Sequence, residues 1–306
     1  MLISFILPAY KAKFLDQAIE SILGQSYGNI ELIIVDDDSP QNLEEIVSRY
    51  NDPRISYFRN EVNIGGKDLV AQWNKCISYA NGEYLVLAAD DDIYHKNFTQ
   101  ECIKLIEKYP EVDMLRSRIS LINDQGDLIE IDGILAERCS QEEYVYSWIK
   151  GVPYVCIGNY MFKTKAIQTE KFDNLPFAFG TDTITTVKLA KNGMANTKEM
   201  LFDFRISDIH LSSDPTKYEQ KVEAITSLYS MLGKIKYKKP TNSIEEFCQS
   251  RVQWDTLYQK CVYDYYNVAI KHLPFRKIGK IEDCKLLNRK DKLKMYGRFI
   301  FEKIIK

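Results

Sequence analysis

The sequence predicts an α/β protein in which helices flank a mostly parallel, twisted sheet, followed by a helical C-terminal extension. Two observations support this prediction. Over the first 110 residues, apolar runs of strand length alternate with segments in which apolar residues recur at helical spacing. Beyond residue 215 the spacing is helical throughout. Strands separated by helices of this length form βαβ units, which place their strands parallel in one sheet.

The elements of the first 110 residues can be assigned in order. Strands are expected at residues 2–7, 30–35, 54–58 and 83–89, and helices at residues 14–25, 42–50, 67–80 and 98–109. One side of the first helix carries Leu15, Ala18, Ile19, Ile22 and Leu23. Asn81 and Gly82 are expected to end the third helix, and Pro110 to end the fourth.

The rest of the chain divides into a mixed region and a helical one. The mixed region has short strands, a turn at 123–127, and helices at 141–150 and 181–193. Long helices are expected at 218–235 and 244–273, separated by the helix-breaking sequence KKPTNS. We therefore expect two parts, residues 1–212 and residues 213–306.

The overall charge hides a basic C-terminal segment. The 306 residues carry a net charge of −2, so nucleic acid is not expected as a partner. Residues 271–306 contain twelve Lys or Arg and four Asp or Glu, a net of +8, which leaves −10 for the other 270 residues. Such a segment suits peripheral contact with an anionic membrane surface. A terminal helix packed on the domain with a solvated face is the alternative, and the sequence does not separate the two.

The cysteines and the apolar segments predict a cytoplasmic location, at the inner face of the membrane if the basic segment contacts lipid. Seven cysteines without a CxxC pair are expected to be buried free thiols. The first ten residues lack a basic n-region and are interrupted by Pro8, which favours a strand over a signal peptide. No run approaches 18 apolar residues, so no transmembrane helix is expected.

Three consecutive carboxylates, Asp90, Asp91 and Asp92, directly follow the apolar run at 83–89. Two like charges about 5 Å apart repel by roughly 3 kcal/mol at an effective dielectric constant of about 20. A divalent cation would relieve this repulsion, and hard carboxylate oxygens suit Mg²⁺ or Mn²⁺. The alternative is a solvated acidic turn that caps the helix starting near residue 96, and for an isolated triplet this alternative is favoured.

Two other predicted strands also end in polar residues. Pro8, Ala9 and Tyr10 follow the first strand, and Asp36, Asp37 and Asp38 follow the second. In open α/β sheets, ligands bind beyond the carboxyl ends of the strands. Tyr10 offers an aromatic face for a nucleotide base, and Asp37 and Asp90 offer acceptors for a base edge or a ribose. A single Tyr after a strand is more often a core or rim residue, so the prediction depends on the three groups occurring together.

These segments resemble a known family. "SFILPAYKAKFLDQAIESILGQSYGNIELIIVDDDS" is similar to the opening of the family 2 inverting glycosyltransferases of the GT-A fold, and "NGEYLVLAADDDIY" resembles the segment that holds their metal-binding DxD. The similarity runs, with gaps, over about residues 1–210. It implies a Rossmann-like GT-A domain over residues 1–212 that binds a nucleotide-sugar donor, with UDP as the nucleotide.

The resemblance also implies roles for individual residues. The nucleotide-binding positions fall on Pro8, Ala9, Tyr10 and Asp37. The last Asp of DxD falls on Asp91, but Ala89 replaces the first, as in a subset of the family whose acidic pair is shifted to Asp90 and Asp91. Asp91 is therefore assigned to a Mg²⁺ or Mn²⁺ ion, and Asp90 to the ribose or to support of the metal site. Asp92 is a further metal candidate.

The segment "FAFGTDTITTVKLAKNG" resembles the part of the family that carries the general base, with Asp182 in the Asp position and Thr181 replacing the usual Glu. A carboxylate there takes the proton of the acceptor hydroxyl, although Asp also favours helix N-termini as a cap. Lys67 is a candidate for phosphate contact or a solvated lysine. "FRISDIHLS" resembles the segment that folds over the diphosphate, so His210 is a metal or phosphate candidate or simply a packed histidine.

The predicted function is a metal-dependent inverting glycosyltransferase that moves a sugar from a UDP-sugar to a glycan or lipid-linked acceptor in surface polysaccharide assembly. The chain lacks the QxxRW motif of processive relatives, which favours single addition. A sugar nucleotidyltransferase is one alternative, but it requires a Gly-rich loop after the first strand, and "PAYKAKFLDQ" has no glycine. A catalytically silent nucleotide-sugar-binding module is the other alternative, suggested by Ala89.

Overall fold

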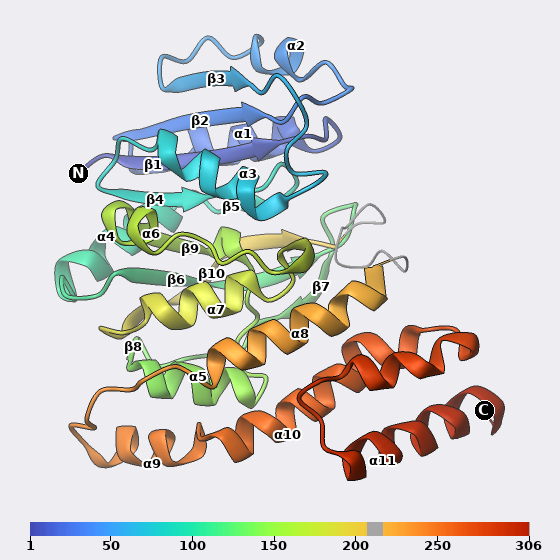
Figure 1. The fold of residues 1–306 in the computed structure, drawn as a ribbon. Helices are drawn as coiled ribbons and strands as arrows, with labels where there is room; N and C mark the ends of the chain where they lie inside the picture. The colour runs from blue at the N-terminus through green and yellow to red at the C-terminus, as the bar shows by residue number, and fades with distance from the viewer. Residues whose placement is uncertain (207–216, 306) are drawn as a thin grey trace.

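The computed structural model describes residues 1–206 and 217–305, so His210 lies outside the described residues. A ten-stranded mixed sheet forms the centre of the described chain, with the order β3-β2-β1-β4-β9-β6-β10-β5 and with β7 and β8 paired to its side (Figure 1). The strands are β1 (Ile3–Ala9), β2 (Ile30–Asp36), β3 (Ile55–Arg59), β4 (Tyr84–Leu87), β5 (Ile93–Tyr94), β6 (Met114–Ile122), β7 (Leu128–Ile131), β8 (Arg138–Cys139), β9 (Tyr160–Lys163) and β10 (Met194–Arg205).

The longest ladders of the sheet are parallel, as predicted. β1 pairs in parallel with β2 and with β4, β2 pairs in parallel with β3, and β6 pairs in parallel with β10. The short strand β9 lies antiparallel between β4 and β6. Because β1, β2 and β4 run in the same direction, the residues that follow them meet at one edge of the sheet.

Alternate side chains of β1 enter two apolar cores on opposite faces of the sheet. Ile3, Phe5 and Leu7 pack with α1 (Leu15–Leu23), α2 (Leu43–Val47) and α4 (Phe98–Lys108). Ile6 packs on the other face, in the core that includes side chains of α3 (Leu69–Cys76), α5 (Gln141–Ile149), α6 (Thr164–Glu170) and α7 (Thr181–Leu189). The sheet therefore has helices on both faces, which confirms the predicted α/β class.

The third predicted helix ends earlier than expected. α3 stops at Cys76 and a single 3-10 turn, η1 (Ile77–Tyr79), follows it, so Asn81 and Gly82 are not its cap. Gly82 has another role. A Cβ atom at this position would lie 2.6 Å from the carbonyl oxygen of Leu2, so glycine is needed where the chain passes close to the start of the sheet.

The helical region that follows contains α8 (Tyr218–Leu232), α9 (Ser243–Arg251), α10 (Trp254–Asp264), η6 (Tyr265–Ala269), η7 (Ile270–His272), η8 (Phe275–Asp283), α11 (Arg289–Ile300) and η9 (Phe301–Ile305). The prediction of a single long helix at 244–273 was wrong. The helical segment is broken between Arg251 and Trp254, where Gln253 is extended (φ −72°, ψ 164°) and Val252 is buried in the core. Apolar side chains from α8 to α11 join the core on the α7 face.

All seven cysteines are free thiols, and six of them are buried, as expected. In the part of the chain that the structure describes, no helix combines the length and the hydropathy required to cross a bilayer.

Candidate active site

Two of the predicted strand ends are joined directly. The backbone N–H groups of Tyr10 and Lys11, which follow β1, donate to Oδ2 of Asp90 at 2.8 and 2.7 Å. Asp90 is buried after β4, and burial raises its pKa. Lys11 opposes that shift, while the neighbouring charge of Asp91 adds to it. Asp90 therefore anchors the turn after β1 to the turn after β4.

Lys11 supplies a positive charge to the acidic triplet. Its Nζ atom lies 2.8 Å from Oδ2 of Asp91 and 3.7 Å from Oδ1 of Asp90. Burial alone would lower the pKa of Lys11, but the charges of Asp90 and Asp91 outweigh it, so the pKa is raised and the side chain stays protonated. The sequence analysis missed Lys11, although its place directly after Tyr10 at a strand end was available as an indication.

The third carboxylate of the triplet, Asp92, is buried, and its Oδ1 accepts a hydrogen bond of 2.9 Å from the backbone N–H of Arg205. Burial raises the pKa of Asp92 well above the ordinary value, and the charge of Asp91 raises it further. Asp92 thus attaches the triplet to the last residue of β10.

Arg205 was not predicted as a residue of the site. Its guanidinium donates hydrogen bonds that hold the turn after β4. Nε donates to the carbonyl oxygen of Asp91 at 2.9 Å, and Nη2 donates to Oε1 of Gln17 at 2.8 Å. Nη1 donates to the carbonyl oxygens of Asn123 and Asp124, both at 3.1 Å. Arg205 is fully buried, so these bonds hold the triplet's backbone without competition from water.

The triplet can be tested as a site for Mg²⁺ or Mn²⁺. Within residues 1–206 and 217–305 there is no group of three His, Cys, Asp or Glu side chains placed to hold a metal ion. Asp90 and Asp92 both accept backbone N–H groups, so among the described members of the site Asp91 is the carboxylate most open to a cation. The residues fit an ion that takes one protein carboxylate and completes its shell with phosphate oxygens and water, provided that Lys11 leaves Asp91.

Asp37, the predicted nucleotide-binding carboxylate, is buried at the end of β2. Its Oδ1 accepts from Nδ2 of Asn60 at 2.7 Å and from the backbone N–H of Ile64 at 2.9 Å, and its Oδ2 accepts from the N–H of Gly65 at 2.6 Å. A Cβ atom at Gly65 would lie 2.9 Å from this Oδ2. Asp37 therefore shapes the loop at 60–66, after which Lys67 is exposed.

Tyr10 lies between these two acidic groups. The residue is 43% exposed, and its carbonyl oxygen accepts from Oγ of Ser39 at 2.6 Å. The backbone N–H of Asp37 donates to the carbonyl oxygen of Ala9 at 2.9 Å, while Pro8 is half-buried and Ala9 is buried. An exposed aromatic face therefore stands at the sheet edge between Asp37 and Asp90.

Asp182 lies in the first turn of α7 and is partly buried. Burial raises its pKa to about 6, while the N–H of Thr183, 2.7 Å from Oδ1, opposes the shift. Burial and then the charges of Asp92 and Asp182 raise the pKa of the Cys156 thiol, so this thiol lies within the electrostatic reach of both carboxylates. The helix start at Gly180 needs its left-handed backbone (φ 83°).

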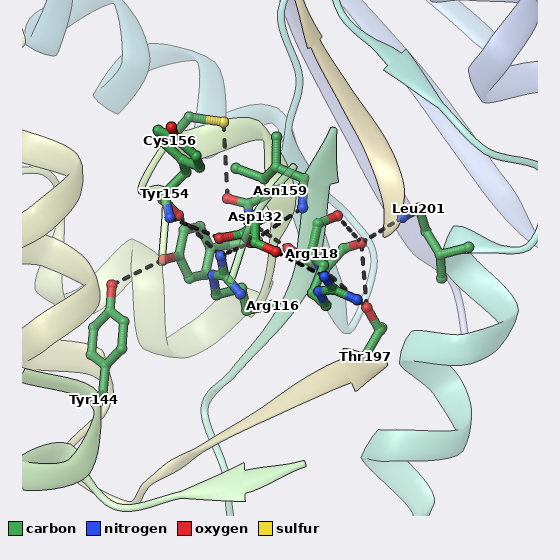
Figure 2. A network of polar contacts seen from close by, with 12 residues as sticks. Arg116, Arg118, Asp132, Tyr144, Tyr154, Cys156, Asn159, Thr197 and Leu201 are labelled. Carbon is green, nitrogen blue, oxygen red and sulfur yellow. Dashed lines mark hydrogen bonds and ion pairs between the residues drawn. The ribbon is translucent and has the colours of Figure 1, made fainter. Parts of the chain in front are cut away.

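A buried polar network holds the loop that carries Cys156 (Figure 2). Arg116 and Asp132 form a fully buried ion pair. The backbone N–H of Tyr154 donates to Oδ1 of Asp132 at 2.9 Å, and Nη2 of Arg116 donates to the carbonyl oxygen of Tyr154 at 3.1 Å. The same charge pair therefore binds both backbone groups of Tyr154, two residues before Cys156.

The chain is similar to known proteins in three kinds of comparison. The family model described as Glycosyl transferase family 2 matches residues 4–192. The chain is 29% identical over 147 residues, 48% of this chain and 54% of the relative, to the protein from Escherichia coli named "UDP-Glc:alpha-D-GlcNAc-diphosphoundecaprenol beta-1,3-glucosyltransferase WfgD". It is 41% identical over 99 residues, 31% of this chain and 34% of the relative, to "Putative colanic acid biosynthesis glycosyl transferase WcaA" from E. coli strain K12.

The chain thus spans about half and about a third of the lengths of these two relatives. Among solved structures it resembles residues 1–349 of TarS from S. aureus, with a TM-score of 0.70, 14% identity and coverage of 98% of this chain and 86% of that one. At this identity the likeness shows the fold alone, and it confirms the expected GT-A-like arrangement.

Proposed function

The chain belongs to glycosyl transferase family 2, and we propose that it transfers a sugar from a nucleotide sugar to an acceptor hydroxyl with inversion at the anomeric carbon. The supporting observation is the meeting of Tyr10, Asp90 and Asp91 at one sheet edge. Asp182 and Asp92 both act electrostatically on the thiol of Cys156. We assign donor binding and chemistry to residues 1–212, and contact with the acceptor partly to residues 213–306.

For the donor we propose UDP as the nucleotide, because the WfgD relative is named for a UDP-sugar. The base would stack on the exposed ring of Tyr10, beside the backbone of Pro8 and Ala9. The loop shaped by Asp37, with Lys67 after it, would border the nucleotide, and Asp90 would support the ribose side. The positions of Tyr10, Asp37 and Asp90 after neighbouring strands support this proposal.

We propose Asp91 as the protein ligand of a Mg²⁺ or Mn²⁺ ion, which when bound neutralises the diphosphate and the charge that develops on the leaving group. Asp92 is a weaker candidate because its Oδ1 already accepts from Arg205. His210 remains a candidate outside the described residues. In the absence of donor, Lys11 neutralises the same carboxylate.

Asp182 is proposed to act as the general base. With a pKa of about 6 it is largely ionised at neutral pH, yet basic enough to accept a proton. It would take the proton of the acceptor hydroxyl as that oxygen forms the new bond to the anomeric carbon. The bond from this carbon to the diphosphate oxygen breaks, and the nucleoside diphosphate leaves with the bonding electron pair. A single displacement of this kind inverts the configuration.

The acceptor class is proposed as a lipid-linked glycan in surface polysaccharide assembly, because WfgD is named for a diphosphoundecaprenol-linked substrate. A silent nucleotide-sugar-binding module is the second candidate, because Lys11 already balances Asp91 and Ala89 replaces an acidic residue. The two differ in whether bound donor is ever cleaved.

The experiment is a screen of nucleotide sugars by thermal shift with Mn²⁺, since a ligand that binds the native state raises its apparent stability. Release of nucleoside diphosphate is then measured with the donor that binds. We expect release that Asp91→Ala or a chelator abolishes, while the exposed-site variant Asp255→Asn behaves as wild type. Binding without cleavage in the presence of acceptor lipid extract supports the silent module, and release of pyrophosphate supports a nucleotidyltransferase.

A further inference from the structure

The last helical segment of the described chain has two apolar faces. On one face, Met295 and Phe299 are buried in the core that continues from the α7 side of the sheet. Four other apolar side chains of α11 and η9 are exposed to solvent. Their exposed fractions are 71% for Leu293, 40% for Ile300, 51% for Phe301 and 64% for Ile304.

These four exposed side chains form one stripe, which we call the outer face. Positions 293, 300, 301 and 304 recur at helical spacing, and at about 100° per residue they lie within roughly one third of the helix circumference. Met295 and Phe299 fall on roughly the opposite side. Gly297 lies within the outer face, and a Cβ atom there would meet open space. The outer face therefore points away from the protein.

Basic residues border the outer face. Arg289, Lys290, Lys294 and Lys303 are all exposed. Helical spacing places Arg289 and Lys303 along one edge of the stripe, Lys294 along the other edge, and Lys290 just inside that second edge. An apolar stripe between rows of cations is the pattern of a helix that lies in the interface of an anionic membrane. Surface helices that are fully solvated have no such apolar band.

A basic pocket of about 370 Å³ shares Lys303 with the border of the outer face; it is lined by Asn267, Lys271, His272, Arg298, Glu302 and Lys303. The Glu302 carboxylate is already engaged by the hydroxyl of Tyr266 at 2.7 Å and by Nε of Arg298 at 3.0 Å. Lys271, Arg298 and Lys303 outnumber the single carboxylate of Glu302, so the pocket carries a net positive charge. Its size and charge suit a phosphate group.

We propose that the outer face seats on the surface of an anionic phospholipid bilayer and that the basic pocket receives a lipid phosphate. Leu293, Ile300, Phe301 and Ile304 would enter the boundary between headgroups and acyl chains. The surrounding Lys and Arg would attract the negative surface potential. Residues 271–306 carry a net charge of +8, which gives the attraction its strength.

The charge and the apolar stripe together favour a bilayer over two other partners, a second copy of this chain and a nucleic acid. A symmetric dimer through the outer face would place the basic segments of two copies against each other, which like-charge repulsion disfavours. Nucleic acid would satisfy the cations but would leave the apolar stripe without a partner. A bilayer with anionic lipids satisfies both.

If the outer face lies on a membrane, the sheet edge that carries Tyr10, Asp90 and Asp91 would be brought toward a lipid-linked acceptor. This consequence rests on the proposed function. The ring of His272 stacks on Tyr218 with centroids 4.5 Å apart, and Nζ of Lys221 lies 4.3 Å from the Tyr218 ring and 5.2 Å from the Phe179 ring. Phe179 lies three residues before Asp182. The carboxyl ends of β1, β2 and β4 and the end of α11 point to the same side of the molecule (Figure 1).

The test is co-sedimentation of the full chain with vesicles of phosphatidylcholine, with and without phosphatidylglycerol. We expect binding to the anionic vesicles only, and a loss of at least about tenfold for Phe301→Asp/Ile304→Asp and for Lys271→Glu/Lys303→Glu. Leu128→Asp, at an equally exposed apolar position on β7, is the matched control and should bind as wild type. Thermal unfolding should confirm that all variants fold.

Three results would overturn the proposal. In co-sedimentation, the wild-type protein could stay in the supernatant with anionic vesicles, or the variants could bind these vesicles as well as wild type does. In light scattering, the protein could be a dimer that Phe301→Asp/Ile304→Asp disrupts. Binding to duplex DNA that Phe301→Asp/Ile304→Asp leaves unchanged, with no vesicle binding, would point to nucleic acid instead. Cleavage of donor in vesicle-free solution should be unaffected by these variants, so failure of lipid binding and failure of the glycosyltransferase proposal give different results.

Discussion

The Nζ atom of Lys11 lies 2.8 Å from Oδ2 of Asp91, although the two residues are 80 positions apart in the chain. This ion pair explains how three consecutive carboxylates tolerate one another beside the core. Backbone N–H groups of Tyr10 and Lys11 donate to Asp90, the N–H of Arg205 donates to Asp92, and Lys11 balances Asp91. The turn is therefore stable with a cation that the chain itself provides, and any metal ion at Asp91 must compete with that cation.

We predict that Lys11→Met strengthens the binding of Mn²⁺ to the protein without donor by about fivefold, because a partly buried ion pair of about 1 kcal/mol no longer competes for Asp91. Isothermal titration calorimetry measures this directly.

Lys13→Met is the control for this prediction, because Lys13 pairs with Asp124 on the neighbouring surface and does not reach the triplet. Equal Mn²⁺ affinity in wild type and Lys11→Met would mean that the ion pair does not compete with metal. That result would not affect the assignment of Asp182 as the general base.

A second prediction concerns Asp182 in the chemical step. Asp182→Asn should lower kcat for sugar transfer by about 10²–10⁴-fold, the range that loss of a general base produces. The affinity for donor should change little, because Asp182 lies on α7 and not among the turns assigned to the nucleotide. Steady-state kinetics with the donor found by the thermal-shift screen provide the measurement, and unchanged kcat would reject the role of base.

The pH dependence of transfer should follow the same carboxyl. With a pKa of about 6 for Asp182, the rate should fall about tenfold per pH unit below pH 6 and reach a plateau above it. A half-maximal rate near pH 4 instead would mean that an ordinary, exposed carboxyl controls the reaction.

The charged carboxylate of Asp182 should also lower the free energy of unfolding at neutral pH. Its pKa rises on folding from an ordinary 3.8 to about 6, so the folded state disfavours the charged form. The cost is absent below about pH 4, grows as the pH rises to 6 and is constant above that, where it reaches roughly 3 kcal/mol. Urea unfolding should show Asp182→Asn more stable than wild type at pH 8 by about this amount and equally stable at pH 4.

Local patterns predicted the part of the fold that determines the site. The apolar runs before Tyr10, Asp37 and Asp90 are buried parallel strands, and their polar ends meet because parallel strands share an edge. The antiparallel insertion of β9 between β4 and β6 was not predictable, because its pairing depends on partners far along the chain. The break between α9 and α10 was missed because neither glycine nor proline marks it.

The supporting residues of the site were the harder part. Arg205 is the last residue of a strand, and its bonds reach residues 82, 114 and 188 positions away, so no local spacing identifies it. The place of Lys11 after Tyr10 at a strand end was an indication in the sequence, but its partners Asp90 and Asp91 follow another strand, so their pairing was not. Resemblance to a family indicates residues that contact ligands, whereas residues that hold the turns emerge only when the chain is folded.

The buried Arg116–Asp132 pair leads to the last prediction. Both side chains are fully buried, and they bind the N–H and the carbonyl oxygen of Tyr154 (Figure 2). Nε and Nη1 of Arg116 lack a hydrogen-bond partner among the described residues, so the guanidinium depends on Asp132 for compensation. Arg116→Met should therefore lower the free energy of unfolding by about 3–5 kcal/mol, because it leaves the Asp132 carboxylate buried without its counter-ion.

The double variant Arg116→Met/Asp132→Leu should recover part of this loss, since no unpaired charge remains, and a double-mutant cycle from urea unfolding measures the coupling. Arg138→Met, which breaks the exposed pair with Glu111, serves as control and should change stability by less than about 1 kcal/mol. If the loss of stability in Arg116→Met were as small as in this control, the ion pair would not hold the Tyr154 loop. We expect instead that Arg116→Met releases the loop, so that thiol reagents react with Cys156 in the folded variant. An unchanged, slow reaction of Cys156 would contradict this expectation.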